Sequence, residues 1–144
     1  MYLTTEQQLD LLEVAVPNLT WCNILPSGAF FKPDAKMSDV MAPELLYRGL
    51  GSPDREPNLA ERIWESVMGR DVAIHVMDKR DLHLGWMMKR NFDLADNRVR
   101  VFFPDEFKEI KSGTWSGQVA DIWFQIVVTG KVLYGVHANK MHLL

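Results

Sequence analysis

The sequence has one cysteine, no long hydrophobic run and no compositionally biased tract. A single thiol, Cys22, excludes a disulfide within the chain and is typical of proteins kept in a reducing compartment. The longest clean apolar run is about seven residues, far shorter than a membrane-spanning helix requires. The opening residues lack the basic, apolar and small-residue succession of a secretory signal. We therefore expect a cytoplasmic protein that makes no contact with a membrane.

Motifs that carry well-defined chemistry are also missing. The chain has no Gly-x-Gly-x-x-Gly fingerprint, no phosphate-binding Gly-Lys-Ser/Thr loop and no Gly-x-Ser-x-Gly elbow. Cys22 lies among apolar neighbours in "LTWCNIL", which favours a buried, inert thiol over a nucleophile. The sequence therefore predicts no catalytic residue and no cofactor, and it favours a non-catalytic protein.

The composition is that of a folded globular protein. The 144 residues are 47% hydrophobic and 24% charged, and they show no internal repeat or linker. We expect one domain over residues 1–144. Helical patterns dominate the first half and strand patterns the second, which predicts an α+β fold. The expected architecture is an antiparallel β-meander with the N-terminal and central helices packed on one of its faces.

Hydrophobic periodicity and turn residues predict the individual elements. The predicted helices are residues 4–16 after a Thr4 or Thr5 cap, 58–70 with Asn58 as the cap and Gly69 at the end, and 104–113. The predicted strands are two short ones within 19–32, then 72–77, 82–88, 99–103 and both arms of a hairpin over 121–137. Residues 38–50 fit a helix and a strand equally well.

Two histidines flank the predicted hairpin of residues 72–88. A three-residue loop would pair Val76 with Leu84, and it would bury Ile74, Val76, Leu84 and Trp86 on one sheet face. His75 and His83 would then be diagonal neighbours on the opposite face, with Asp81 beside them. His75, Asp81 and His83 are therefore the candidate metal ligands, with His137 or His142 as a fourth. A solvated strand face without metal is the competing interpretation.

The charges are unevenly distributed. The chain has a net charge of −3, yet residues 79–100 contain six basic side chains against three acidic ones. Such a basic segment suits an acidic protein surface or a phosphate-bearing ligand. With Trp115, which lies in a glycine-containing loop, the predicted partner-binding residues are Lys79, Arg80, Lys89, Arg90, Arg98, Arg100 and Trp115.

Three hypotheses for the function follow. The first is a non-catalytic protein-binding module, such as an inhibitor, immunity protein or accessory subunit, whose partner is an acidic protein surface or a second copy of the chain. The second is a small nucleotide- or metal-dependent enzyme that uses His75, Asp81, His83 and Arg48. The third is a nucleic-acid-binding protein that uses the same basic residues, with Trp86 or Trp115 stacking on bases. The missing catalytic motifs favour the first.

Overall fold

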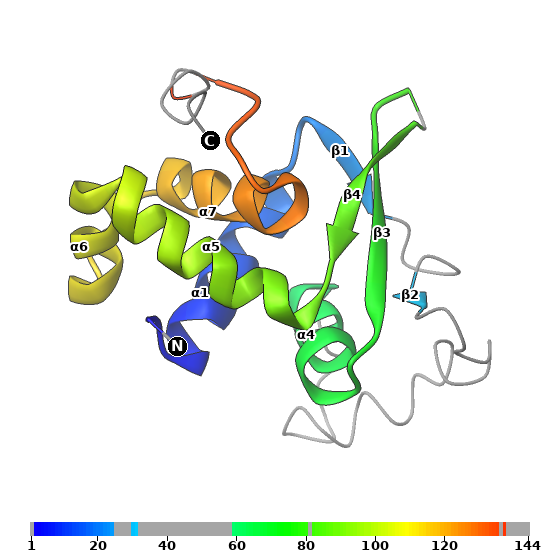
Figure 1. The fold of residues 1–144 in the computed structure, drawn as a ribbon, viewed down its shortest axis with the longest axis horizontal. Helices are drawn as coiled ribbons and strands as arrows, with labels where there is room; N and C mark the ends of the chain where they lie inside the picture. Colours follow the sequence, from blue (N-terminus) through cyan, green and yellow to red (C-terminus); the bar gives the residue numbers. More distant parts are fainter. Residues whose placement is uncertain (1, 25–29, 32–58, 81, 136, 138–144) are drawn as a thin grey trace.

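The computed structural model describes residues 2–24, 30–31, 59–80, 82–135 and 137. These residues form an α+β structure in which helices gather beside an antiparallel sheet (Figure 1), so the predicted fold class is confirmed. The helices are α1 (Thr5–Ala15), α4 (Leu59–Trp64), α5 (Lys89–Phe102), α6 (Pro104–Ser112) and α7 (Gly117–Thr129). The strands are β1 (Cys22–Ile24), β2 (Phe30–Phe31), β3 (Ala73–Asp78) and β4 (His83–Met87). A 3-10 turn, Val16–Asn18, follows α1, and a π-helical turn, Glu65–Gly69, continues α4.

β3 is the central strand of the sheet. β4 pairs antiparallel with one edge of β3, and β1 and β2 pair with the other edge, one after the other. Along β3, Ile74 and Val76 are fully buried, while His75 and Met77, which alternate with them, are only half-buried. One face of the sheet is therefore covered, with α7 against β4, and the other is partly open to solvent. We call this second side the outer face of the sheet.

Several predicted elements are confirmed. α1 begins with a capping box, in which Oγ1 of Thr4 accepts from the Gln7 N–H at 3.1 Å and Oε1 of Gln7 accepts from the Thr4 N–H at 2.9 Å. α6 begins at Pro104 and ends at Gly113, whose φ of 78° is the left-handed conformation that stops a helix. The predicted cap Asn58 and the ambiguous stretch 38–50 lie outside the described residues.

The predicted hairpin over residues 121–137 is wrong, because most of this stretch belongs to α7. α7 contacts α1, α5 and β4, and nine of its side chains are buried. A helix enclosed on all sides is apolar on all sides, so its sequence loses the 3.6-residue period and resembles a buried strand. Gly130 does not form a hairpin turn; with φ 84° it ends α7, and its N–H donates to the Ile126 carbonyl at 2.9 Å.

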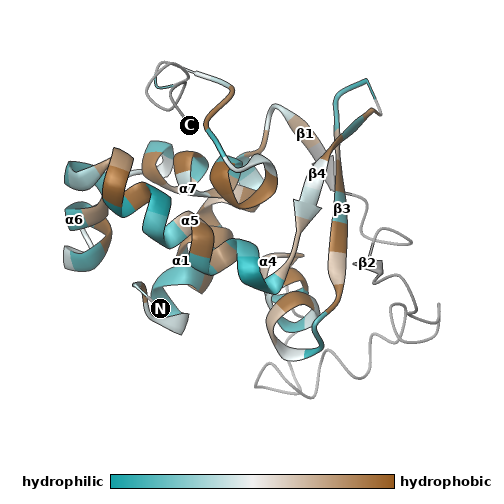
Figure 2. Ribbon diagram, viewed as in Figure 1, coloured by the Kyte–Doolittle hydropathy of each residue, from teal (hydrophilic) through white to brown (hydrophobic). Residues whose placement is uncertain are grey.

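The predicted strand 99–103 is also wrong, because α5 runs through Phe102. Phe92, Ala95, Asp96 and Val99 are its buried residues, and their spacing of three and four is that of one helix face. The short apolar run "VRVFF" resembles a strand only when it is taken without the residues before it. Figure 2 shows that the first turn of α5 is strongly hydrophilic. This part of the sequence therefore gave no hydrophobic signal for a helix.

The register of the β3–β4 hairpin matches the prediction only near its tip. The Asp78 N–H donates to the Leu82 carbonyl at 2.9 Å, and Met77 pairs with His83, as a three-residue loop requires. A β-bulge then shifts the register, so that Val76 pairs with Gly85 instead of Leu84. Gly85 and Met87 consequently take the covered face, and Trp86 joins His75 on the outer face. The prediction that Trp86 is buried with Val76 is wrong for this reason.

Candidate functional site

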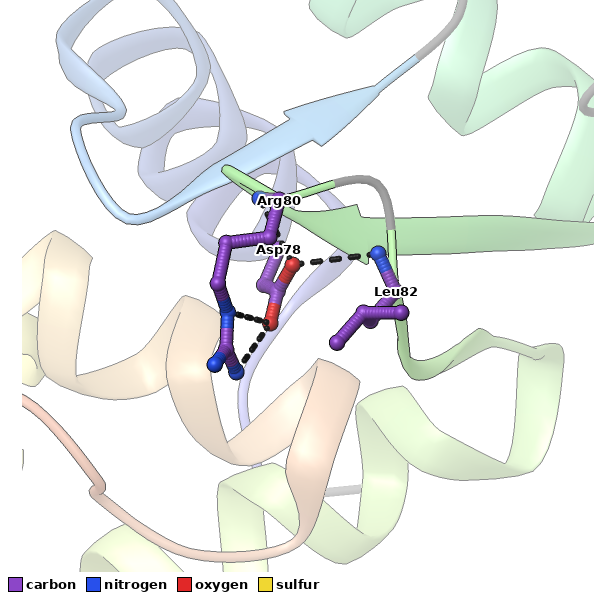
Figure 3. Close-up of polar contacts among 3 residues, drawn as sticks. All are labelled: Asp78, Arg80 and Leu82. Atoms are coloured by element: carbon purple, nitrogen blue, oxygen red, sulfur yellow. Dashed lines mark hydrogen bonds and ion pairs between the residues drawn. The ribbon is translucent and has the colours of Figure 1, made fainter.

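The tip of the β3–β4 hairpin is organised by the carboxylate of Asp78 (Figure 3). Its Oδ1 accepts hydrogen bonds from the backbone N–H groups of Arg80, at 2.8 Å, and Leu82, at 3.1 Å. Its Oδ2 accepts from the Arg80 guanidinium, with Nη2 at 3.0 Å and Nε at 3.3 Å. The bond from the Leu82 N–H has the largest effect and lowers the pKa of Asp78; burial opposes it, and the bonds and charge of Arg80 add to the lowering, so the pKa lies below its usual value. The Arg80 side chain is therefore held at the turn although it is 79% exposed.

Three aromatic rings meet on the outer face of this hairpin: His75 of β3, and His83 and Trp86 of β4. The ring centroids of His75 and His83 are 4.9 Å apart, and those of His75 and Trp86 are 4.7 Å apart. Nε2 of His75 lies 2.8 Å from Nδ1 of His83, which is a hydrogen-bonding distance. The bulge produces this arrangement, because it pairs His75 with Trp86 while His83 stays opposite Met77. We call the three residues the ring cluster.

The histidine pair has a defined proton requirement. A hydrogen bond between two ring nitrogens needs one N–H and one lone pair, so only one of the two facing nitrogens carries a proton. Partial burial, and then the charge of His83, lower the pKa of His75 below its usual value. Both effects favour the neutral form of His75 over its cation.

The structure brings together two of the three candidate metal ligands. His75 and His83 touch, whereas Asp81, the proposed fourth ligand His142, and Arg48 lie outside the described residues. His137 packs edge-on against Phe103, with ring centroids 5.9 Å apart. Among the described residues, no group of three or more His, Cys, Asp or Glu side chains is arranged to hold a metal ion.

The predicted basic residues are divided among different parts of the molecule. Lys79 and Arg80 lie at the hairpin tip, and Lys89 and Arg90 are exposed in the first turn of α5, just beyond the other end of β4. Nη1 of Arg98 donates to the Gly130 carbonyl at the end of α7, at 2.7 Å.

Arg100 is engaged on another part of α5. Its Nη2 donates to Asn97 Oδ1 at 2.8 Å, and its guanidinium lies 4.7 Å from the centre of the Tyr2 ring. Four of the six basic side chains therefore flank β4, and the other two make contacts elsewhere.

Trp115 does not join the basic residues. It is half-buried against the hydrophobic core, and it lines a shallow groove between α1 and the start of α7. Asp10 and Glu13 of α1 line the same groove, so its surroundings are acidic.

Cys22 is buried in β1, as predicted. Burial raises the pKa of its thiol to about 12, against a smaller lowering by the nearby Lys79. The thiol is protonated at neutral pH, which makes it a poor nucleophile.

The sequence reasoning missed a buried polar cluster around Asp96 of α5, whose side chain is 0% exposed. Its Oδ2 accepts from Nε2 of Gln8, at 2.7 Å, and from the Leu3 N–H, at 3.2 Å. Its Oδ1 accepts from Nε1 of Trp123, at 2.9 Å. Burial outweighs these bonds and raises the pKa of Asp96 to about 6. The available signal was an acidic residue, Asp96, within the apolar stripe of α5. It was missed because residues 99–103 were predicted to be a strand and not the end of this helix.

Comparisons with protein-family models, curated proteins and solved structures found no match to this chain. In the part of the chain that the structure describes, no helix is both long and apolar enough to cross a membrane.

Proposed function

We propose that this protein is a non-catalytic protein-binding module whose contact surface is the outer face of the β3–β4 hairpin. The supporting observation is the ring cluster of His75, His83 and Trp86. The solvent-facing side of an antiparallel sheet usually carries polar and charged residues, but here three aromatic rings touch one another. Leu82, at the hairpin tip, is 54% exposed. Aromatic and apolar side chains of this kind form the centre of many protein interfaces.

The charges around the ring cluster indicate the kind of partner. Lys79 and Arg80 lie at one end of β4, and Lys89 and Arg90 follow its other end. An aromatic centre with basic residues at both ends suits a protein surface with an apolar patch flanked by carboxylates, although Arg80 already shares its charge with Asp78. The single buried thiol of Cys22 supports a cytoplasmic location as part of this proposal.

The nucleic-acid alternative has less support. A binder of nucleic acid presents its cations along one stripe that follows the phosphates. Arg80 instead pairs with Asp78, Arg98 donates to the end of α7, and Arg100 lies over Tyr2, so at least three of the six predicted cations are engaged within the molecule.

The proposal is tested by comparing capture from native host lysate by the tagged full chain and by two variants. One variant is Trp86→Ala, which removes the largest ring of the cluster, and the other is Lys89/Arg90→Glu. We expect the wild type to retain an acidic protein in stoichiometric amount and both variants to lose it. Val101→Ala, which changes an apolar residue that is 53% exposed on α5, is the matched control and should retain it.

Three outcomes would contradict the proposal: equal capture by the wild type and both variants, recovery of nucleic acid instead of protein, or no captured macromolecule at all. Light scattering separates a second copy of the chain from a different partner, because self-association raises the mass of the purified protein alone. Thermal unfolding of each variant distinguishes loss of binding from loss of fold.

A further inference from the structure

We infer that His75 and His83 form a surface site for a divalent late-transition-metal ion, which binds between Nε2 of His75 and Nδ1 of His83. The two residues lie on paired strands, and their ring planes are only 20° apart. The centroids are 4.9 Å apart while the facing nitrogens are 2.8 Å apart, so the rings meet through their nitrogens and not through their faces. Two imidazole nitrogens thus face one another on the outer face.

The distance between the nitrogens is close to that of a metal site. Zinc–nitrogen bonds are about 2.0–2.1 Å, so two histidine ligands at a tetrahedral angle have nitrogens about 3.3 Å apart. The observed 2.8 Å has to widen by about half an ångström, and the two rings have to turn so that both lone pairs point at the ion; rotations about the side-chain bonds supply both changes. The paired backbones of β3 and β4 hold the two residues close together before a metal binds.

Metal binding requires a lone pair on both facing nitrogens. In the hydrogen-bonded pair one of these nitrogens carries a proton. That proton leaves to solvent, and solvent returns a proton to the other nitrogen of the same ring. The ring changes tautomer, and the ion replaces the N–H···N hydrogen bond.

The ligand set determines the class of ion. Imidazole nitrogen suits copper, nickel and zinc, whereas calcium and magnesium require oxygen ligands. Within the described ranges no third His, Cys, Asp or Glu completes a cluster. Two protein ligands leave the remaining positions to water, which makes this an open, exchangeable site and not a closed structural one. By the general order of divalent affinities, Cu²⁺ binds most tightly.

Trp86 supplies a local readout, because its ring centroid lies 4.7 Å from that of His75 and 6.2 Å from that of His83. Cu²⁺ bound to the pair would quench the fluorescence of this indole. The experiment titrates the full chain with Cu²⁺ and follows tryptophan fluorescence together with binding heat. We expect saturable 1:1 binding and quenching for the wild type, and loss of both in His75→Ala and in His83→Ala.

Two further variants separate the site from other metal ligands. His137→Ala removes a histidine that packs against Phe103, and it should bind and quench like the wild type. Trp86→Phe should keep the binding heat and lose most of the quenching. His83→Gln keeps a polar side chain on the strand but not the imidazole ligand, so it should fold and fail to bind.

The inference is overturned if the wild type shows no saturable Cu²⁺ binding. It is also overturned if His75→Ala, His83→Ala and His83→Gln bind as tightly as the wild type, since the ion then lies elsewhere. Unfolding curves of the three variants establish that they are folded. The metal titration needs no partner, so its result is independent of the capture experiment.

Discussion

The Asp96 cluster and the ring cluster are both groups of polar side chains from different elements, but they stand in opposite surroundings. Asp96 is fully buried, and its carboxylate accepts three N–H bonds from Leu3, Gln8 and Trp123. His75 and His83 satisfy one another on a partly open sheet face. A buried charge must have hydrogen-bond partners, so the Asp96 cluster holds different elements of the fold together. The pair of His75 and His83 on the partly open face contributes little to stability and remains accessible to a ligand.

The variant Asp96→Ala is the strongest test of the structural role that this comparison gives to the Asp96 cluster. The change leaves the Leu3 N–H, Gln8 Nε2 and Trp123 Nε1 buried without their acceptor, and it opens a small cavity. We expect the free energy of unfolding to fall by about 3–5 kcal/mol, measured by urea denaturation. Asp93→Ala, an exposed acid one turn earlier on α5, should change it by less than about 0.5 kcal/mol. A loss below about 1 kcal/mol for Asp96→Ala would mean that the cluster does not fasten these elements.

The pH dependence of stability tests the role of the Asp96 carboxyl in a second way. The pKa of Asp96 is about 6 in the folded protein against 3.8 as the ordinary value, so the folded state binds this proton more tightly. The contribution of the carboxyl to stability is fully present below pH 4 and is lost as the pH rises to about 6. The loss is about 3 kcal/mol for a shift of this size.

Asp96→Asn removes this titration and isolates it from that of other acids. The difference in unfolding free energy between wild type and Asp96→Asn should therefore change between pH 4 and pH 7, in the direction of a less stable wild type at high pH. The neighbouring charge of Asp93 contributes a small part of the raised pKa. A difference that does not vary with pH would contradict the raised pKa of Asp96.

Trp123→Phe should have a smaller effect, because it removes one of the three bonds to Asp96. The ring of Trp123 also stacks on Phe92, with centroids 5.5 Å apart and planes 7° apart, and phenylalanine keeps part of that contact. We expect a loss of about 2 kcal/mol in urea denaturation. Trp64→Phe is the matched control, since its indole also packs near Phe92, at 5.9 Å, but lies outside the Asp96 hydrogen bonds. If the free energy of unfolding falls equally in the two variants, the effect comes from the smaller ring and not from the lost hydrogen bond.

The smallest effect is expected at the ring cluster. His83 is exposed, and its alanine variant should lower the free energy of unfolding by less than about 0.5 kcal/mol in the absence of metal. The comparison with Asp96→Ala is made by urea denaturation in chelator-containing buffer. A fall of several kcal/mol in the free energy of unfolding would show that the histidine pair stabilises the fold.

The sequence predicted the elements with a clear period or clear end signals. The cap Thr4 marks the start of α1, and Pro104 and Gly113 mark both ends of α6. α7 could not be recognised in this way, because its enclosure on all sides removes the periodic signal. The two histidines were placed on one face correctly from the loop length. The bulge that brings Trp86 beside them places Gly85 close to the Val128 carbonyl, where a side chain would not fit, and this contact joins distant parts of the chain.

The capping and docking of α1 have a consequence for synthesis. Leu3 and Gln8 bind a carboxylate that lies 93 and 88 residues later in the chain, and α1 also packs on α7, which is later still. Because translation proceeds from the N-terminal side, α1 is synthesised before α5 and α7. Its apolar side therefore stays uncovered until these two helices have been made. Because α1 can dock fully only after α5 and α7 have been synthesised, its apolar side is exposed to aggregation or chaperone capture during translation.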